Sequence, residues 1–337
     1  MFSKHTGSVF CCGLNTSAGL VATGGEDDTG YVWSVDGGEV VYTMDGWGDS
    51  VTSVAWSSDC TMLAACDMAG SVKVWKVPGY QLVWSFELGQ DILWLRWHPV
   101  AHVLVAGTAE GQVWLWRLPG GDSKVMGGGE RVECGEVLGD GKRAVCGYSD
   151  GAVRLWDLRG GEVLHLMAGG HKDSVTSVVG HSGREVVLSA SMDSTVNIWN
   201  CNSGKSVGML MCGDAQVENS PSSVECLVVG KGRGEYTAVT GTLDGVVSVW
   251  DLSSQVARCK TKVGEGVTVI ETAENMVYCG TLEGAVRAVD SRTGAAVNEW
   301  TGNKGSVLDL QLGEAEGVLV TASDDGSARI FDVRVPG

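Results

Sequence analysis

One short pattern recurs eight times along the chain at a nearly constant spacing. In its clearest copy, residues 142–171, three apolar runs are separated by tight turns, and the second run ends at the pair Trp156-Asp157. Alternating apolar runs bounded by turn residues predict β-strands, and a repeat period of about 42 residues predicts an array of similar units. The residues equivalent to Trp156, which lie 39 to 51 residues apart, are Trp33, Trp75, Trp116, Trp156, Trp199, Trp250, Val289 and Phe331.

An Asp-Gly turn shortly before a Trp-Asp pair, repeated at this period, resembles the WD-repeat β-propeller family, in which each repeat supplies four strands to a blade. Trp156-Asp157 and Trp250-Asp251 match that ending in full, and Trp199-Asn200, Val289-Asp290 and Phe331-Asp332 depart from it by one residue. We therefore expect an all-β fold: an eight-bladed WD-repeat β-propeller with four-stranded antiparallel blades and a last blade closed by the N-terminus.

The uninterrupted repeat predicts a single domain over residues 1–337. The extra length between the fifth and sixth repeats falls in the polar stretch 213–223, which we expect to be a surface loop; a regulatory role for it stays open. The last repeat shows three strands, and residues 1–4 make a short closing strand, so we expect the natural protein to carry an N-terminal extension. The expected blades span about 5–45, 46–88, 89–126, 127–168, 169–212, 223–263, 264–300, and 301–337 with 1–4.

Composition limits the compartment and the chemistry. No apolar run approaches the length of a membrane span, and the first residues do not resemble a signal peptide. The 11 cysteines include no Cys-x-x-Cys pair and mostly lie in apolar runs, as expected for small buried side chains in a reducing compartment. We expect a protein of the cytoplasm, with the nucleus as a second location, that does not bind membranes.

Catalytic patterns are missing from the sequence. The six histidines are scattered over different repeats, no Gly-x-Ser-x-Gly motif occurs, and no His-Cys cluster has metal-ligand spacing. We therefore expect a protein that is not an enzyme and that needs neither a cofactor nor a metal.

Acidic residues are in excess throughout the chain. There are 41 acidic and 24 basic residues, for a net charge of −17. Every repeat has at least one acid in the turn between its second and third strands, and in a propeller these turns would lie on one rim. A rim of one charge sign favours a basic partner and repels the phosphates of nucleic acid, so we expect no direct nucleic-acid binding.

We predict a protein-binding site on this rim, with carboxylates as electrostatic contacts and one tryptophan as an anchor. A structural role is the alternative for any single acid, because WD repeats use the turn aspartate to cap the turn and to hold a histidine. This alternative does not account for the doubled acids at 27–28 and 324–325, or for Trp47, which should be exposed beside them. The predicted residues are Glu26, Asp27, Asp28, Trp47, Asp49, Asp67, Asp91, Glu110, Asp150, Glu283, Asp324 and Asp325.

The tryptophans of the repeat are expected to form the blade cores. Resemblance to the WD-repeat family implies that each indole N–H meets a Ser or Thr of the second strand, a histidine from a Gly-His pair, and the turn aspartate. Gly170-His171 is the one pair that clearly supplies this histidine. Most blades should therefore lack the complete network.

A closer resemblance to one family implies a function. The segments KHTGSVFCC, ATGGEDDTGYVWS and DGKRAVCGYSDGAVRLWDL are similar, in order and spacing, to the angio-associated migratory cell protein family. That family is similar to the fungal WD-repeat chaperone dedicated to the universal L-sixteen type (eukaryotic L-ten) ribosomal protein of the large subunit. The resemblance implies a monomeric chaperone that binds the basic N-terminal segment of its nascent client and delivers it to pre-ribosomes. It is close over the first 160 residues and thinner in repeats five to seven, which leaves the client open.

Two other functions stay open. Trp156-Asp157-Leu158-Arg159 and Phe331-Asp332-Val333-Arg334 resemble the Trp-Asp-x-Arg box of substrate receptors of cullin-type ubiquitin ligases. The family name also suggests a signalling or cell-migration scaffold. The salt dependence of binding separates the chaperone from the ligase receptor in part. Contacts of exposed carboxylates are screened over about 8 Å at physiological ionic strength, whereas an adaptor interface built on apolar burial is much less sensitive to salt.

Overall fold

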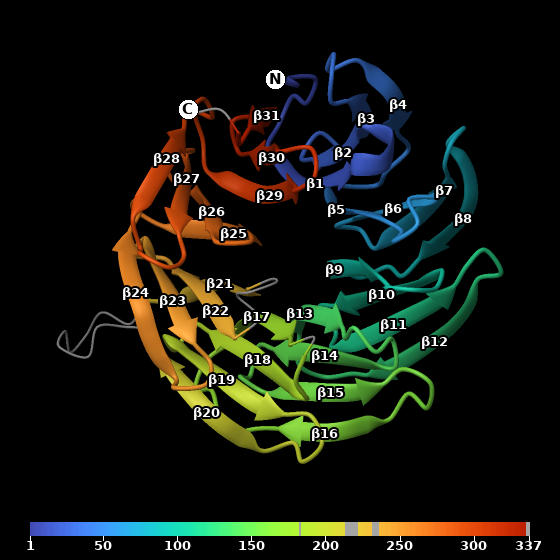
Figure 1. The fold of residues 1–337 in the computed structure, drawn as a ribbon. Helices are drawn as coiled ribbons and strands as arrows, with labels where there is room; N and C mark the ends of the chain where they lie inside the picture. The colour runs from blue at the N-terminus through green and yellow to red at the C-terminus, as the bar shows by residue number, and fades with distance from the viewer. Residues whose placement is uncertain (182, 213–221, 231–235, 335–337) are drawn as a thin grey trace. The chain divides into compact units, whose positions relative to one another are not determined.

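The computed structural model describes residues 1–181, 183–212, 222–230 and 236–334 (Figure 1). Across these residues the chain forms thirty-one β-strands and one short 3₁₀ helix, η1 (Thr16–Ala18). The strands form eight antiparallel sheets, each in chain order. These sheets are the blades of an eight-bladed β-propeller, so the predicted fold is confirmed. By internal contacts the chain divides into unit 1 (Met1–Gly129 with Thr301–Gly337) and unit 2 (Glu130–Trp300). The single domain over the whole chain stays a prediction.

Unit 1 contains the first three blades and the eighth. Its strands are β1 (Val9–Asn15), β2 (Leu20–Gly25), β3 (Gly30–Ser34), β4 (Val40–Met44); β5 (Val51–Trp56), β6 (Met62–Asp67), β7 (Ser71–Lys76), β8 (Gln81–Glu87); β9 (Ile92–Trp97), β10 (Val103–Thr108), β11 (Gln112–Arg117), β12 (Asp122–Gly127); and β29 (Val307–Gly313), β30 (Val318–Ser323), β31 (Ala328–Asp332).

Unit 2 contains the fourth to seventh blades, four strands in each. Its strands are β13 (Val132–Val137), β14 (Arg143–Tyr148), β15 (Val153–Asp157), β16 (Val163–Met167); β17 (Val175–Gly180), β18 (Val186–Ser191), β19 (Thr195–Asn200), β20 (Ser206–Met211); β21 (Val224–Val229), β22 (Thr237–Thr242), β23 (Val246–Asp251), β24 (Val256–Lys262); and β25 (Val267–Ala273), β26 (Met276–Thr281), β27 (Val286–Asp290), β28 (Ala296–Trp300). Of the predicted 213–223 loop, residues 213–221 lie outside the described residues.

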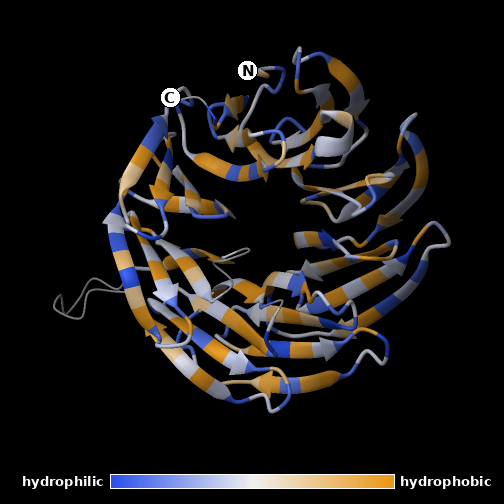
Figure 2. Ribbon diagram, in the orientation of Figure 1, coloured by the Kyte–Doolittle hydropathy of each residue, from blue (hydrophilic) through white to orange (hydrophobic). Residues whose placement is uncertain are grey.

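Apolar side chains pack between successive blades within each unit. One cluster joins Val145 and Leu155 of the fourth blade to Val187 and Trp199 of the fifth. The second strands are therefore buried on both faces, whereas the fourth strands are mostly exposed, with at most one buried residue in each (Figure 2). The eleven cysteines are free thiols and eight are buried, as predicted for small apolar side chains. Burial raises the pKa of the Cys66 thiol to about 12.

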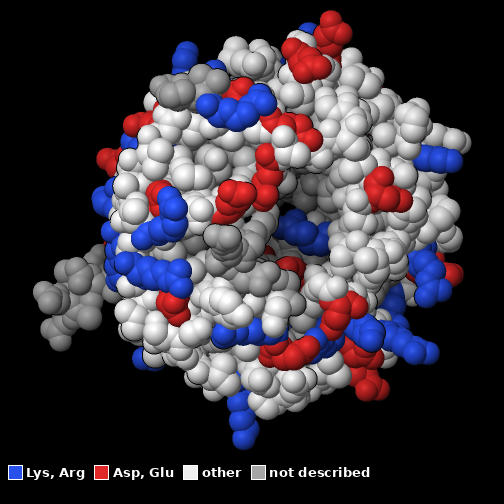
Figure 3. All heavy atoms as spheres, in the orientation of Figure 1, with Lys and Arg blue, Asp and Glu red and all other residues white. Residues whose placement is uncertain are grey.

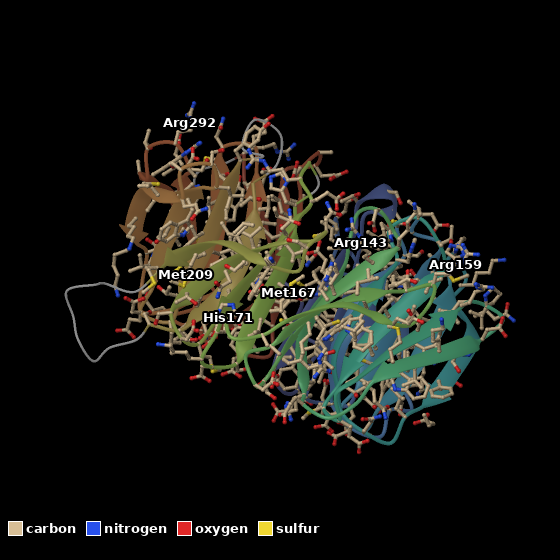
Figure 4. All side chains as sticks on the ribbon, turned by 90° about the horizontal axis from the view of Figure 1, so that it is seen from below. Arg143, Arg159, Met167, His171, Met209 and Arg292 are labelled. Atoms are coloured by element: carbon tan, nitrogen blue, oxygen red, sulfur yellow. The ribbon has the colours of Figure 1, made fainter. Side chains whose placement is uncertain are left out.

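The predicted tryptophan network is complete in the fifth blade. His171 Nε2 lies 2.7 Å from Ser189 Oγ, and His171 Nδ1 lies 3.3 Å from Asp193 Oδ2. The Trp199 indole donates to the same Ser189 hydroxyl at 2.8 Å. Figure 4 labels His171, which sits just before β17. The network ties the entry to β17 to the interior of β18 and β19.

His5 has the same role in the first blade, so the prediction that His171 alone supplies such a histidine was wrong. His5 Nε2 lies 3.0 Å from Thr23 Oγ1, and His5 Nδ1 lies 2.9 Å from Asp27 Oδ1. Burial lowers the pKa of His5 and so favours the neutral ring. The Asp27 carboxylate has the opposite effect on this pKa but does not outweigh burial. The sequence signal was weak because Lys4, rather than a glycine, precedes this histidine.

The N-terminus pairs with the last strand, as predicted for the eighth blade. Phe2 N donates to Ala328 O at 2.7 Å, and Ala328 N donates to Phe2 O at 2.9 Å, which makes one antiparallel bridge beside β31. The Phe2 ring is buried and stacks on Trp33 with centroids 4.9 Å apart and planes 2° apart. The closing contact is therefore a single bridge held in place by a buried aromatic side chain.

Replacing Phe2 by leucine should lower the free energy of unfolding by about 1 kcal/mol, because leucine fills most of the space but loses the aromatic contact with Trp33. Urea denaturation of both proteins measures this difference. Unchanged stability would contradict a role for Phe2 in closing the blade. Replacing the exposed Met1 by leucine is the matched control and should have no effect.

Candidate functional site

The acidic turns of unit 1 follow one another across neighbouring blades. Ser50 Oγ of the second blade donates to Glu26 O of the first at 3.4 Å, and Met68 N donates to Ser50 O at 3.0 Å. In the third blade, Ala109 N donates to Asp91 O at 3.0 Å. The turns after the second strands and the entries to the first strands are thus linked directly, which brings most of the predicted acids of unit 1 onto connected loops.

Six of these carboxylates are exposed and form no ion pair among the described residues. Their distribution matters because an unpaired surface carboxylate keeps its full charge for an incoming partner. They come from all four blades of unit 1. The six are Glu26, Asp28, Asp49, Asp91, Glu110 and Asp324. We call this set the acidic surface.

Two members of the acidic surface converge on one hydroxyl. Ser8 Oγ lies 3.0 Å from Glu26 Oε2 and 2.8 Å from Asp324 Oδ1, which joins residues 316 positions apart in the sequence. The Ser8 amide also donates to Glu26 Oε2 at 3.0 Å. One hydroxyl hydrogen can serve one acceptor at a time, so two negative groups share a single donor.

Three predicted contact residues accept hydrogen bonds from within the chain. Asp27 holds His5 and accepts the Thr6 amide at 3.0 Å. Asp67 is fully buried and accepts amides from Gly48 at 3.0 Å and Ser71 at 2.7 Å.

Asp325 is the third of these. It binds the Ser327 hydroxyl at 2.6 Å and the Lys304 amide at 2.7 Å. Burial alone would raise the pKa of Asp325, but these hydrogen bonds outweigh burial and lower it. The structural alternative raised for the turn acids thus describes Asp27, Asp67 and Asp325.

Trp47 is half-buried, in contrast to the expected exposed anchor. Its indole donates to Met44 O at 3.0 Å, and its ring packs edge-on against Trp75 at 5.9 Å. The Lys73 ammonium lies 4.3 Å from the ring centroid and donates to Gly46 O at 2.6 Å. The aromatic face that a partner's cation would use is therefore already covered by a cation of the chain.

The two predicted acids of unit 2 differ from each other. Asp150 is exposed and caps its own turn through the Ala152 amide at 2.9 Å. Glu283 accepts the Glu265 amide at 2.9 Å and pairs with Arg287 at 3.2 Å, so its charge is compensated. Sequence reasoning missed this use of a third-strand cation, although Lys73 and Arg287 occupy equivalent positions in their repeats.

The neighbours Asp324 and Asp325 allow binding and stability to be separated. Asp324→Lys should weaken binding of a basic peptide about tenfold with an unchanged melting temperature, because Asp324 is exposed and its side chain accepts one hydrogen bond, from the Ser8 hydroxyl, in the described chain. Asp325→Lys should lower the free energy of unfolding by about 2 kcal/mol or more, because it removes the acceptor of three hydrogen bonds. Fluorescence anisotropy and urea denaturation measure the two effects. Lower stability in the Asp324 variant, with normal stability in the Asp325 variant, would contradict these roles.

Other clusters give weaker candidates. A cavity of about 420 Å³ in unit 2 is lined in part by Arg143 and His181, but Arg143 is bound by Asp140 at 2.6 Å and Glu185 at 2.9 Å. Among the described residues no group of three or more acidic, histidine or cysteine side chains could hold a metal ion. No helix within the described ranges is long and apolar enough to cross a membrane.

Comparison with known proteins identifies the repeat. Residues 1–34, 38–76, 161–200 and 294–332 match the family model of the WD domain, G-beta repeat. The crystal structure of Saccharomyces cerevisiae Sqt1 has a TM-score of 0.88 at 23% identity and covers all of this chain, with 98% of that chain matched. Chaetomium thermophilum Sqt1, in a structure bound to the N-terminus of the ribosomal protein L10, has a TM-score of 0.87 at 20% identity over 98% of both chains. Both likenesses concern the fold.

Sequence relatives are more specific. The ribosome assembly protein SQT1 of Saccharomyces cerevisiae is 25% identical over 98% of this chain and 86% of its own length. The human angio-associated migratory cell protein is 38% identical over 99% of this chain and 80% of its own length. The dog protein of the same name matches equally well. The chain therefore belongs to the angio-associated migratory cell protein family of WD-repeat β-propellers.

Proposed function

We propose that this protein is a non-enzymatic chaperone that binds the basic N-terminal segment of a large-subunit ribosomal protein, of the universal L-sixteen type, and delivers it to pre-ribosomes. Two similarities support this: the relationship to a ribosome assembly protein, and the fold shared with a protein crystallised on the N-terminus of L10. In this proposal the client lies on the acidic surface of unit 1.

The paired carboxylates on Ser8 are the observation that carries the proposal. Glu26 and Asp324 belong to blades at the two ends of the sequence, and no cation of the described chain pairs with either of them. Like charges held close together are unfavourable in the free protein, and a client lysine or arginine between them would relieve this repulsion. The other four exposed acids extend the negative field along the neighbouring turns and would speed the encounter with a basic segment.

The same field favours a protein client over nucleic acid. An acidic surface repels phosphates, and a basic client segment covered by it is kept from binding RNA at random. In this proposal the protein acts as a monomer, without a cofactor, in the cytoplasm, with the nucleus as a second location.

Affinity purification at two salt concentrations tests the proposal. The tagged protein is isolated from its own cells at low and at moderate salt, and bound proteins are identified by mass spectrometry. One dominant basic ribosomal protein, lost as salt rises, is the expected result because exposed charges are screened within about 8 Å at physiological ionic strength. A cullin adaptor that survives the salt, with no ribosomal protein enriched, would replace the proposal by the ligase-receptor function.

A direct measurement complements this purification. The purified chain is titrated with a labelled peptide of the N-terminal segment of that ribosomal protein, and with the same peptide carrying glutamine in place of each lysine and arginine. Affinity for the basic peptide alone is expected. Equal affinity for both peptides would remove electrostatic recognition from the proposal.

A further inference from the structure

The outermost strand of the fifth blade exposes an uncharged apolar stripe. β20 is the last strand of its sheet, so one of its edges has no partner strand within that sheet. Its residues Ser206–Met211 include no charged side chain. Val207, Met209 and Met211 are 51%, 49% and 54% exposed. Exposed apolar edges invite association, and proteins usually protect them with charges or proline. β20 has neither.

The buried side of β20 fixes this stripe to the sixth blade. Leu210 and Cys212 pack in one cluster with Trp250 of β23. Gln255, in the turn before β24, donates its side-chain amide to Val207 O at 3.1 Å. β20 is therefore held against the sixth blade from its beginning to its end, and Figure 4 shows Met209 on this outer side of unit 2.

The neighbouring outermost strand, β24, is basic. Arg258, Lys260 and Lys262 occupy alternate, exposed positions. This concentration is unusual in a chain whose net charge is −17. Figure 3 shows basic side chains along the edge of the molecule where Figure 1 places β24. Arg258 pairs with Asp251, and Lys262 donates to Asp244 O, which leaves Lys260 as the cation of this strand without a carboxylate or carbonyl partner in the described chain.

Lysines lie at both ends of the apolar stripe. The Lys260 ammonium is 5.5 Å from the centre of the Trp250 ring, and Trp250 packs in one cluster with Leu210 and Cys212 at the end of β20. At the other end, Lys205 immediately precedes β20, is exposed, and forms no ion pair among the described residues. Protection of an edge explains lysines on β24. It does not explain why the adjacent strand is left apolar between two unpaired lysines.

We propose that this outer wall, formed by β20 with Lys205 and Lys260, binds an extended acidic polypeptide segment with apolar side chains at alternate positions. β20 spans about 20 Å at roughly 3.3 Å per residue, so apolar side chains of the partner contact Val207, Met209 and Met211 while carboxylates near its two ends reach the lysines. Methionine adapts its shape to such contacts. A polypeptide fits better than RNA because the centre of the wall offers apolar surface and no cation. The site is built from unit 2 alone and does not depend on the proposed function.

A synthetic peptide tests the wall directly. The labelled probe has valines alternating with threonines between two pairs of glutamates, and its binding to the full chain is followed by fluorescence anisotropy. One comparison peptide carries lysines for the glutamates, a second carries serines for the valines, and a single-stranded oligoribonucleotide serves as the third. We expect the acidic apolar peptide to bind at least about tenfold more tightly than either altered peptide. No binding of this probe, or tighter binding of the RNA, would overturn the proposal.

Variants locate the contact. Met209→Asp and Lys260→Glu should each weaken binding of the probe about tenfold, because the first puts a carboxylate in the apolar stripe and the second repels the acidic end. Val125→Asp is the matched control: Val125 is 49% exposed on β12, the outermost strand of another blade. Unchanged melting temperatures, and unchanged binding of the basic client peptide, show that the fold and the acidic surface are intact. Equal loss in the Val125 variant would exclude a specific site on β20.

Discussion

Replacing Glu26 and Asp324 together by lysine should weaken binding of the basic client segment by about a hundredfold while the chain stays folded. The two carboxylates share the Ser8 hydroxyl, so the double replacement turns the most negative point of the acidic surface positive. Juxtaposed like charges at an interface cost several kcal/mol, and a hundredfold change corresponds to about 3 kcal/mol. Both side chains are exposed, and neither is part of a buried network.

Isothermal titration calorimetry with the client peptide measures this loss. The matched control replaces Glu39 and Asp122, also exposed carboxylates of unit 1 but outside the acidic surface, by lysine. It makes the same change in net charge and should alter affinity only slightly. If both double variants lose affinity equally, binding follows net charge, and the acidic surface is not the site.

Replacing Trp156 by alanine should lower the free energy of unfolding by about 3 to 5 kcal/mol. The side chain is 3% exposed, and its indole donates to the Tyr148 hydroxyl at 3.3 Å. Alanine leaves a cavity in the fourth blade and leaves the buried Tyr148 hydroxyl without this donor. Such a loss is a large part of the roughly 5 to 15 kcal/mol that stabilises a typical protein.

Urea denaturation monitored by circular dichroism measures the change, provided that the slope of the transition is the same in both proteins. Trp156→Phe separates the two causes, because phenylalanine keeps most of the volume and loses the N–H donor. We expect a smaller loss, of about 1 kcal/mol from the hydrogen bond together with a contribution from the reduced volume. A loss below 1 kcal/mol for the alanine variant would contradict the role of Trp156 as blade core.

The strands and the repeat could be predicted because they depend on residues close together in the sequence. Asp150 and Gly151 form the turn before β15, and Gly151 has φ +81°, a conformation that glycine adopts readily. Alternation of apolar residues and a turn of this kind are visible in any copy of the repeat. The eight blades follow from counting copies.

The roles of individual acids could not be read in the same way. Asp27 and Asp28 are neighbours, yet Asp27 points to His5 while Asp28, at φ +53°, is exposed. Which of two adjacent carboxylates turns inward depends on the backbone of the turn and on a histidine 22 positions away. Whether the ring of Trp47 is open to a partner likewise depends on Lys73, which comes from β7 and lies over that ring. Contacts between distant segments decide these roles, and such contacts cannot be predicted from composition and spacing.

Because Phe2 pairs with Ala328, the eighth blade is completed only after β31 has been synthesised. During translation the four blades of unit 2 emerge with all of their strands in order, whereas Val9, Val21 and Trp33 must wait for Val320 and Ala322 to cover them. Apolar surface that stays uncovered during synthesis is prone to aggregation. A protein proposed to shield a nascent client therefore has a long vulnerable interval in its own biosynthesis, and this interval ends when β31 leaves the ribosome.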